Sequence, residues 1–395
     1  MKSSLALLVT GAFVAAVSAT PHGQQPASEP GAASKHVIPL ALNDGWRTGS
    51  LEQAGIDRGR IEAMTDSLRA QPDLNVHAVL IEREGRLVYE EYFAGKDERW
   101  GTPLGVVKFT RATKHDLRSV TKSVVSALVG IALDSGAITS LDRPLLDYFP
   151  EFKELQVPER RAITIRHALM MAAGFEWNED VPYTDPKNDE IVMIRSSDPL
   201  RYVLSRPIVA APGTTWRYNG GLTQVLGTIV QRATKQPLAT YARAKLFSPL
   251  GIRDFEWLGS LADVPSAASG LRLRPRDLAK FGSLYLHEGR WNGRVVVPAK
   301  WIVESTRRHL PLPKQPTRGY GYQWWHACYS TPFGSLEAPT AVGNGTQRVI
   351  VLRAHQTVVT VLAGRYNDFS ANPPEQLLHD FILPALPPPR GTGCS

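Results

Sequence analysis

The spacing of hydrophobic and polar positions changes along this chain and predicts where its helices and strands lie. Residues 76–93 alternate in two strand-like runs around Glu84-Gly85, which favours a β-hairpin. In residues 58–70 the apolar positions instead recur at helical spacing. Other segments predict helices at residues 164–171, 221–233, 238–247, 276–287 and 374–381, and strands at residues 321–327, 348–352 and 357–362.

Strand patterns near both ends of the chain surround a mostly helical middle, at about residues 145–290. The last two strand patterns flank the short connection 353–356, which is typical of a hairpin. This order predicts an α+β fold, in which both chain ends build one antiparallel sheet, helices flank it and a helical region is inserted. We expect a cleft between the sheet edge and the helical region.

The run at residues 117–136 (LRSVTKSVVSALVGIALDSG) is apolar on almost every side, which predicts a buried helix. Ser119 begins this helix and Lys122 follows three positions later, so their side chains lie on neighbouring turns of one face. Burial disfavours the charged form of an amine, so Lys122 is a candidate general base for a Ser119 nucleophile. A serine that only caps the helix and a lysine that reaches solvent would give the same pattern.

A second candidate, Tyr218, lies in the turn-rich segment 212–221 (PGTTWRYNGG), just before another apolar helix pattern. A phenol close to an ammonium group can ionise or relay a proton, so Tyr218 is a candidate proton relay for Ser119. The structural alternative is a tyrosine whose ring only packs.

Together, Ser119-Val120-Thr121-Lys122 and Tyr218-Asn219 resemble the serine β-lactamase and penicillin-binding-protein superfamily. Residues 218–227 and 269–282 are most similar to the aminohexanoate-dimer hydrolases, which cleave linear nylon-oligomer amides and carboxyl esters. The resemblance covers about residues 45–385. Residues 141–150, 163–169 and 249–252 are similar to the class C branch, which includes esterases and D-amino-acid peptidases.

The resemblance implies a β-lactamase/transpeptidase-like fold in which Ser119 is the acylated nucleophile, Lys122 the base and Tyr218 the proton relay. It also implies that Gly343 lets the backbone approach the substrate closely. The N–H of Asn344 would then join that of Ser119 as an oxyanion hole.

Two positions depart from the family pattern. The Tyr-x-Asn motif places its amide at position 220, where this chain has Gly220, and Asn219, one place earlier, is the candidate substrate contact. The Lys-Thr-Gly or His-x-Gly motif is best matched by residues 341–343 (AVG), so a charged contact to a substrate carboxylate is missing and efficient penicillin turnover is not expected. Arg348 or Arg353 could supply that charge instead.

Three functional hypotheses follow. The first is a serine hydrolase that forms an acyl-enzyme and cleaves small esters or linear amides. The second is a D,D-peptidase or β-lactamase acting on cell-wall peptides or β-lactams, and the third is a catalytically silent peptidoglycan-binding or sensor protein that keeps the fold. Intact Ser119, Lys122 and Tyr218 favour an enzyme.

Charge and motifs argue against other classes. The formal net charge is +8, but the basic residues are scattered among acidic ones, so we expect no nucleic-acid partner. No zinc-binding or nucleotide-binding motif is present, and we expect neither a metal nor a cofactor. The oligomeric state stays open.

The N-terminal residues 1–19 have a basic start, an apolar stretch and the small residues Val17-Ser18-Ala19, which are typical of a secretory signal peptide. We expect export to the periplasm or the medium after cleavage near Ala19, without stable membrane insertion, because no later apolar run reaches the roughly 20 residues needed to span a bilayer. Cys328 and Cys394 form one disulfide or stay as two thiols. The remaining chain divides into a flexible leader (20–44), a hydrolase domain (45–383) and a Pro-rich tail (384–395).

Overall fold

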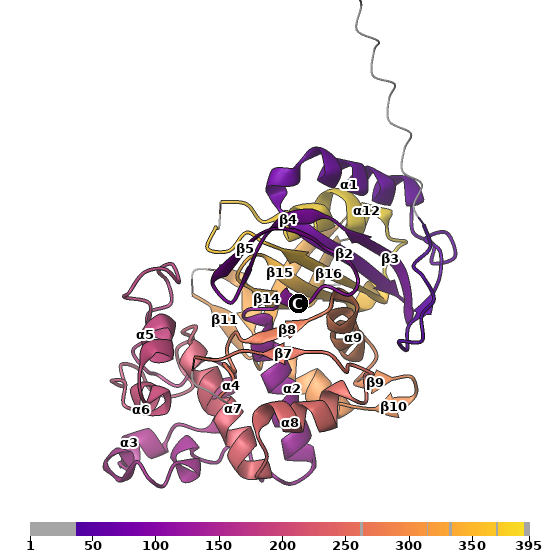
Figure 1. The fold of residues 1–395 in the computed structure, drawn as a ribbon. Helices are drawn as coiled ribbons and strands as arrows, with labels where there is room; N and C mark the ends of the chain where they lie inside the picture. Colours follow the sequence, from indigo (N-terminus) through magenta and orange to yellow (C-terminus); the bar gives the residue numbers. More distant parts are fainter. Residues whose placement is uncertain (1–36, 261–263, 314, 332–333, 369, 391–395) are drawn as a thin grey trace, which may run out of the picture. The chain divides into compact units, whose positions relative to one another are not determined.

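The computed structural model describes residues 37–390, except residues 261–263, 314, 332–333 and 369 (Figure 1). The predicted signal peptide lies outside the described residues, as do Cys394 and the leader up to residue 36. Cys328 is in a strand of the sheet.

A nine-stranded sheet is the centre of the fold, with the order β1-β3-β2-β16-β15-β14-β13-β12-β11. Neighbouring strands are antiparallel except for β1 and β3. Because β2 pairs with β16, strands from the two ends of the chain meet in the middle of the sheet, and the predicted α+β fold is confirmed. The strands are β1 (Arg47–Thr48), β2 (Val76–Arg83), β3 (Arg86–Tyr92), β11 (Leu310–Leu312), β12 (Gln315–Tyr320), β13 (Trp325–Thr331), β14 (Gly334–Gly343), β15 (Gln347–Leu352) and β16 (Thr357–Ala363).

The hairpin predicted around Glu84-Gly85 is present between β2 and β3. Both turn residues have positive φ, 51° for Glu84 and 76° for Gly85, as a tight turn matched to the twist of the strands requires.

The strand pattern predicted at residues 321–327 is wrong for its first half. Residues 321–324 are the connection between β12 and β13, because Gln323 has a φ of 64° and its buried amide donates to the carbonyls of Ala168 and Leu169.

Side chains of the sheet alternate between two hydrophobic cores. Val79 and Ile81 pack with α1 (Arg58–Ala70) and the C-terminal helical turns on one face. Ala78 and Leu80 face the other core, which holds α2 (Val120–Asp134) and α9 (Pro275–Leu286). Figure 1 shows α1 and α12 (Leu383–Ala385) together on the first of these faces.

Most helices lie where the sequence predicts them. The segment 238–247 is α-helical only over α8 (Leu238–Ala242) and continues as a π-helical turn, and residues 373–385 divide in the same way. Helices α4 (Ile165–Leu169), α7 (Gly220–Thr234) and α11 (Pro373–Leu377) match predicted segments. Other helices were not predicted from the sequence: α3 (Pro158–Arg161), α5 (Asp189–Arg195), α6 (Pro199–Leu204) and α10 (Ala299–Ser305).

Small strands outside the main sheet were not expected from the sequence. The hairpin β4 (Ala94–Arg99) and β5 (Thr102–Lys108) follows β3. A three-stranded sheet joins β6 (His115–Asp116) to β8 (Leu271–Leu273) and β7 (Glu256–Trp257), so the middle region is not wholly helical. The pair β9 (Arg290–Trp291) and β10 (Arg294–Val295) completes the strands described.

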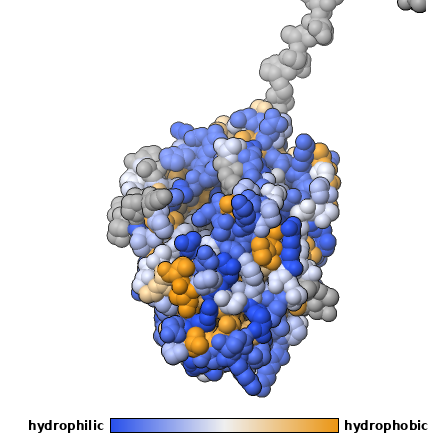
Figure 2. All heavy atoms as spheres, turned by 90° about the vertical axis from the view of Figure 1, so that its left-hand side faces the viewer, coloured by the Kyte–Doolittle hydropathy of each residue, from blue (hydrophilic) through white to orange (hydrophobic). Residues whose placement is uncertain are grey.

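The surface on the α5–α6 side is mostly hydrophilic, with hydrophobic residues gathered in a few small patches (Figure 2). None of the helices in the described part of the chain has the length and apolar character that crossing a membrane requires.

Candidate active site

Ser119 lies at the N-terminal end of α2 with a helical backbone (φ −68°, ψ −7°). Its side chain makes no capping hydrogen bond, so the simple helix-cap alternative does not describe it. The preceding residue, Arg118, has a left-handed backbone (φ 49°) that is unfavourable for a side chain of this kind. Ion pairs with Glu98 and Asp116 hold Arg118 in place, and its guanidinium stacks over the ring of Tyr366.

Lys122 lies one turn along the same helix, and its Nζ is 3.1 Å from Ser119 Oγ. It also donates to the carbonyl oxygen of Ala268, again at 3.1 Å. Only 1% of Lys122 is exposed, so the lysine does not reach solvent as the alternative interpretation required. The predicted pairing of serine and lysine is therefore present as geometry, inside the protein.

Two glutamates that the sequence analysis missed complete the surroundings of Lys122. Glu190, in the first turn of α5, is buried and places a carboxylate oxygen 3.5 Å from Lys122 Nζ. Glu179, on the segment before α5, accepts hydrogen bonds from Trp177 Nε1 (2.6 Å) and Tyr183 Oη (3.0 Å). An acidic residue in a first helical turn ordinarily stabilises the helix, so the sequence carried no signal that Glu190 faces the lysine.

The two carboxyl groups differ in their protonation. Burial, followed by the negative charge of Glu190, raises the pKa of Glu179 to about 8. Burial acts in the same direction on Glu190, but the charge of Lys122 and hydrogen bonds with Glu179 and Ser269 outweigh it and lower the pKa of Glu190. At neutral pH the pair therefore holds one proton on Glu179, and ionised Glu190 faces Lys122.

This carboxyl pair explains the departure at position 220. A Cβ atom on Gly220 would lie 2.2 Å from a carboxylate oxygen of Glu190 and 3.3 Å from one of Glu179. The Gly220 backbone N–H also donates to Glu179. Here the two carboxyl groups occupy the space that an asparagine side chain at position 220 would need.

Tyr218 also reaches Ser119, to which its phenol is hydrogen-bonded. Its ring lies beneath Lys122, with Nζ 5.1 Å from the ring centroid, and packs against Trp325 at 5.5 Å. Burial, with the negative charge of Glu179, raises the pKa of Tyr218 well above its ordinary value. Of the two chemistries predicted for this phenol, the environment disfavours ionisation and leaves proton relay by a neutral hydroxyl.

Two adjoining cavities of about 470 and 380 Å³ meet at Ser119, Tyr183 and Asn344, which line both. The first extends along α5 past Ile191 and Ile194. The second has Tyr218, Trp216, Trp325 and Tyr329 along its wall. Larger cavities of about 670 and 830 Å³ lie beside β9 and β10, but none of the three predicted catalytic residues lines them.

Gly343 ends β14 directly beside the segment that carries the nucleophile. A Cβ atom there would lie 2.3 Å from the carbonyl oxygen of Leu117, which is a close backbone approach. Asn344 follows at the junction of the two cavities, and its side chain forms two hydrogen bonds with Asn367. Both residues therefore border the cleft at Ser119, as the resemblance implied.

Asn219 lies differently from the prediction. Its side-chain oxygen accepts from the N–H of Leu222 at 3.0 Å and caps α7, and it is not among the residues that line the two cavities. Asn219 is 1% exposed, and its candidate role as a substrate contact is replaced by that of a helix cap.

One of the two arginines considered as replacements for the cation missing at position 341 lies in the cleft. Ala341 is fully buried in the core, whereas Arg348, which pairs with Val342 across the strands, lines the second cavity with Arg318. Arg353 instead donates to Thr306 and is not among the residues that line the cavities at Ser119. Of the two arginines considered from the sequence, only Arg348 reaches the cleft.

A model of the Beta-lactamase family matches residues 61–381 of this chain. The esterase EstB of Burkholderia gladioli is 30% identical over 213 residues, which cover 52% of this chain and 52% of EstB. The 6-aminohexanoate-dimer hydrolase of Paenarthrobacter ureafaciens is 27% identical over 350 residues, which cover 77% of this chain and 83% of that protein. The solved structure of a penicillin-binding protein homologue from Caulobacter crescentus aligns with a TM-score of 0.63 at 17% identity, covering 84% of this chain and 98% of that one.

At 17% identity the Caulobacter protein shows a shared fold. The match to the family model includes Ser119, Lys122 and Tyr218. The match to EstB spans only about half of each protein, so it does not assign the reaction of EstB to this chain. The resemblance found in the sequence is confirmed: this chain belongs to the Beta-lactamase family and is a serine hydrolase.

Proposed function

We propose that the chain is an exported hydrolase that forms an acyl-enzyme on Ser119 and cleaves carboxyl esters or linear amides. The observation that carries the proposal is the 3.1 Å separation of Ser119 Oγ and buried Lys122 Nζ where two cavities meet. A serine in hydrogen-bond reach of a base, itself positioned by a third group, is the arrangement that nucleophilic catalysis requires.

Acylation begins with the Lys122–Glu190 pair. In its neutral form Lys122 is an amine 3.1 Å from Ser119 Oγ, and ionised Glu190, 3.5 Å from Nζ, stabilises the ammonium that forms when this amine accepts a proton. The amine takes the Ser119 hydroxyl proton as Oγ bonds to the substrate carbonyl carbon. Negative charge then develops on the carbonyl oxygen, and the backbone N–H groups of Ser119 and Asn344 are the proposed donors to it.

Collapse of the tetrahedral intermediate breaks the bond to the leaving alkoxide or amine. Tyr218, hydrogen-bonded to Ser119 and lying beside Lys122, gives a proton to that leaving atom and regains one from Lys122. In deacylation, water attacks the acyl carbon and loses a proton to the same groups, which return a proton to Ser119 Oγ. Atoms and charge balance over the cycle, and the products are an acid and an alcohol or amine.

The cleft walls support a substrate with an apolar portion. The aromatic rings of Trp216, Trp325 and Tyr329 line the second cavity, and Ile191 and Ile194 line the first. Arg318, in the lining of the second cavity, pairs with Glu375 at 3.4 Å, which leaves Arg348 as the candidate partner for a carboxylate at one end of the substrate. The similarity to the esterase EstB and to a 6-aminohexanoate-dimer hydrolase supports such substrates.

Ester turnover by purified wild-type chain and two serine variants tests the proposal. Ser119→Ala should abolish hydrolysis of p-nitrophenyl butyrate and labelling by a fluorophosphonate probe. Ser126→Ala is the matched control, because Ser126 is fully buried in the same helix and its hydroxyl has no hydrogen-bond partner. Equal turnover by Ser119→Ala and wild type would refute the acyl-enzyme on Ser119.

Nitrocefin, measured beside the ester, separates this proposal from the β-lactamase alternative. With Ala341 buried and no cation on that position, we expect ester turnover without Ser119-dependent nitrocefin turnover. Turnover of nitrocefin that is lost in Ser119→Ala would instead favour a β-lactamase or D,D-peptidase, with Arg348 in the place of the missing lysine.

Export is tested by determining the N-terminal residue of the protein recovered from the host. If the signal peptide is cleaved, we expect the mature chain to begin near residue 20.

A further inference from the structure

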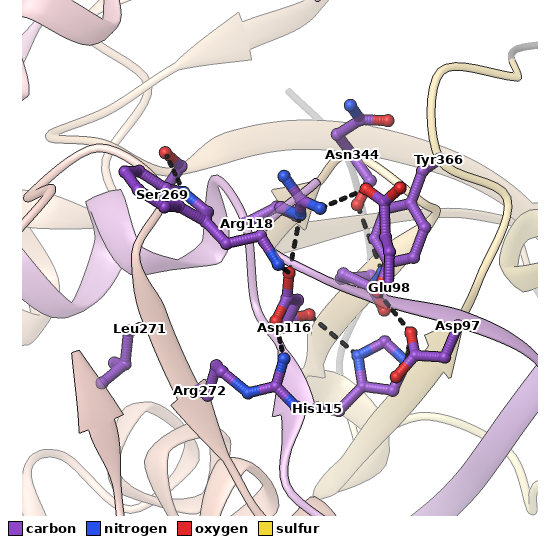
Figure 3. A network of polar contacts seen from close by, with 12 residues as sticks. Asp97, Glu98, His115, Asp116, Arg118, Ser269, Leu271, Arg272, Asn344 and Tyr366 are labelled. Atoms are coloured by element: carbon purple, nitrogen blue, oxygen red, sulfur yellow. Dashed lines mark hydrogen bonds and ion pairs between the residues drawn. The ribbon is translucent and has the colours of Figure 1, made fainter. Parts of the chain in front are cut away.

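A cluster of buried ionisable groups lies beside, but outside, the proposed catalytic set. His77 from β2, Asp97 from β4 and His115 from β6 place one ligand-type atom each within 4.8 Å of one another. Both histidines are fully buried, and Asp97 is 6% exposed. Figure 3 shows His115 and Asp97 in the polar network that continues through Asp116 to Arg118.

The hydrogen bonds fix which nitrogen of each ring carries a proton. Asn75 donates through its amide nitrogen to the Lys96 carbonyl and accepts from the Lys96 N–H, both at 2.9 Å, so its oxygen is identified. That oxygen lies 3.1 Å from His77 Nε2, which must donate to it. His115 Nδ1 lies 2.9 Å from the Asp116 carbonyl oxygen and must also donate.

The two remaining ring nitrogens then face each other without a proton of their own. His77 Nδ1 and His115 Nε2 are 2.9 Å apart, and two neutral rings would oppose their lone pairs at this distance. A cation between the nitrogens relieves the repulsion, and the Asp97 carboxylate oxygen, 3.8 Å from His115 Nε2, supplies a negative charge to hold it.

We propose that His77 Nδ1, His115 Nε2 and the Asp97 carboxylate bind a structural divalent transition-metal ion of the zinc type. Two imidazole nitrogens and one carboxylate oxygen are common ligands of zinc, at about 2.0–2.2 Å each. Nitrogens 2.9 Å apart are somewhat closer than the roughly 3.3 Å between two ligands of a tetrahedral ion at such distances, so the two rings have to separate a little to admit it. The Asp97 oxygen, 3.8 Å from His115 Nε2, also has to move inward, and a fourth ligand such as water would complete a tetrahedral set.

The surroundings of the three ligands support a metal more than a shared proton. Ligating histidines donate their other N–H to a carbonyl or carboxylate group, and both rings do so here, to Asn75 and to Asp116. The carboxylate of Asp97 is oriented in turn by the Tyr366 hydroxyl, which donates at 2.9 Å. Phe109 stacks on His77 at 4.1 Å and covers the ring with apolar surface.

Such an ion would connect three strands to the nucleophile. The chain passes from His115 through Asp116 to Arg118, and Glu98, next to Asp97, pairs with Arg118. A metal that holds β4 against β2 and β6 therefore helps keep the left-handed backbone of Arg118 just before Ser119. No sequence motif predicted the site, because its ligands come from separate strands and have no characteristic spacing.

Zinc binding to the full chain, purified without a histidine tag, tests this proposal. Because the cluster is buried, the chain is unfolded, stripped with chelator and refolded with and without zinc. We expect about one tightly held Zn²⁺ per chain by mass spectrometry and a higher Tm with zinc, since a ligand of the folded state stabilises it. Asp97→Asn should weaken binding at least about 10-fold. His355→Gln, which changes a buried histidine beside the opposite end of β2, where Arg83 donates to its carbonyl oxygen, should not.

A spectroscopic measurement keeps the test independent of variant folding. Cobalt(II) refolded with the wild-type chain should give the ligand-field bands of an ion with two imidazoles and a carboxylate. Failure of zinc and cobalt to bind stoichiometrically would overturn the proposal. Histidine ¹⁵N spectra of the metal-free chain that remain unchanged on adding zinc, with one proton shared between His77 and His115, would overturn it in favour of a proton in the cluster.

Discussion

At the scale of single residues, the packing role of Tyr218 can be tested separately from its role as a proton relay. Its ring packs against Trp325 and beneath Lys122, whereas only its hydroxyl reaches Ser119. Tyr218→Phe keeps the ring and removes the relay, so we expect ester kcat to fall by about 10²-fold with little change in Tm. Tyr320→Phe makes the same change in the neighbouring aromatic cluster and is the control. Equal kcat for Tyr218→Phe and wild type would assign Tyr218 to packing.

The shared proton of Glu179 and Glu190 predicts an alkaline limit to activity. Above its pKa of about 8, Glu179 ionises, and the second buried negative charge repels Glu190 and disturbs the carboxyl pair beside Lys122. Burial keeps the pKa of the facing Tyr183 and Tyr218 well above this range, so neither phenol titrates there. Wild-type kcat/KM should fall above about pH 8, and in Glu179→Gln the fall should move upward by at least about one pH unit.

The control for this pH profile is Glu176→Gln, which changes an exposed glutamate three residues earlier in the chain. Its alkaline limb should coincide with that of wild type. If the limb of Glu179→Gln coincides as well, another group sets the alkaline limit.

The same raised pKa predicts how stability depends on pH. The unfolded chain loses the Glu179 proton near the ordinary value of 4.5, whereas the folded chain keeps it to about pH 8. The contribution of Glu179 to stability is therefore complete below about pH 4.5 and is lost as pH rises toward 8. The lowered pKa of Glu190 has the opposite effect: its contribution to stability is present above about pH 4.5 and is lost as the pH falls below that value. Urea unfolding at pH 5 and pH 8 should show a larger loss of stability in wild type than in Glu179→Gln.

At the scale of elements, the fold could be predicted from the regular periodicity of single segments. The site could be predicted only in part, because some of its residues meet through contacts between segments that are distant in the sequence. Helix α1 and the β2–β3 hairpin follow from patterns within one segment. The Ser119–Lys122 pair follows from helical pitch because both residues are on α2. Glu190 reaches Lys122 from α5, and only the packing of α5 against α7 brings it there, which no local pattern records.

The approach of β14 to the start of α2 predicts the effect of one added methyl group. In Gly343→Ala, the new Cβ would meet the backbone oxygen of Leu117, so β14 or the segment before Ser119 has to move. We expect stability to fall by about 1–3 kcal/mol and ester kcat by at least about 10-fold, because the oxyanion donors shift from the nucleophile.

A glycine-to-alanine change without a clash provides the comparison. Gly59 is exposed in α1, and its added Cβ would meet nothing closer than 3.4 Å. Alanine there should leave ester kcat unchanged and raise stability by up to about 1 kcal/mol. Equal kcat for Gly343→Ala and wild type would show that the close approach of β14 does not position the site.

At the scale of the whole molecule, β2 from the N-terminal part of the chain and β16 from the C-terminal part pair in the most protected part of the sheet. All residues of β2 and β16 are buried, and these strands pair with each other and with β3 and β15. The hairpin β4–β5 is instead a separate two-stranded sheet, and most of β5 is exposed. Its attachment therefore depends on a few side chains, among them Asp97 and Glu98.

Hydrogen exchange measured by mass spectrometry should resolve these two levels of stability. Amides of β2, β15 and β16 can exchange only when the sheet opens as a whole, so they should be the slowest, whereas β5 should exchange early through local opening. If the cluster of His77, Asp97 and His115 binds zinc, removing the metal should speed exchange in β4 and β6 but not in β16. Equal protection of β4 and β16, with or without zinc, would mean that the hairpin opens only with the sheet and that the cluster adds no separate connection.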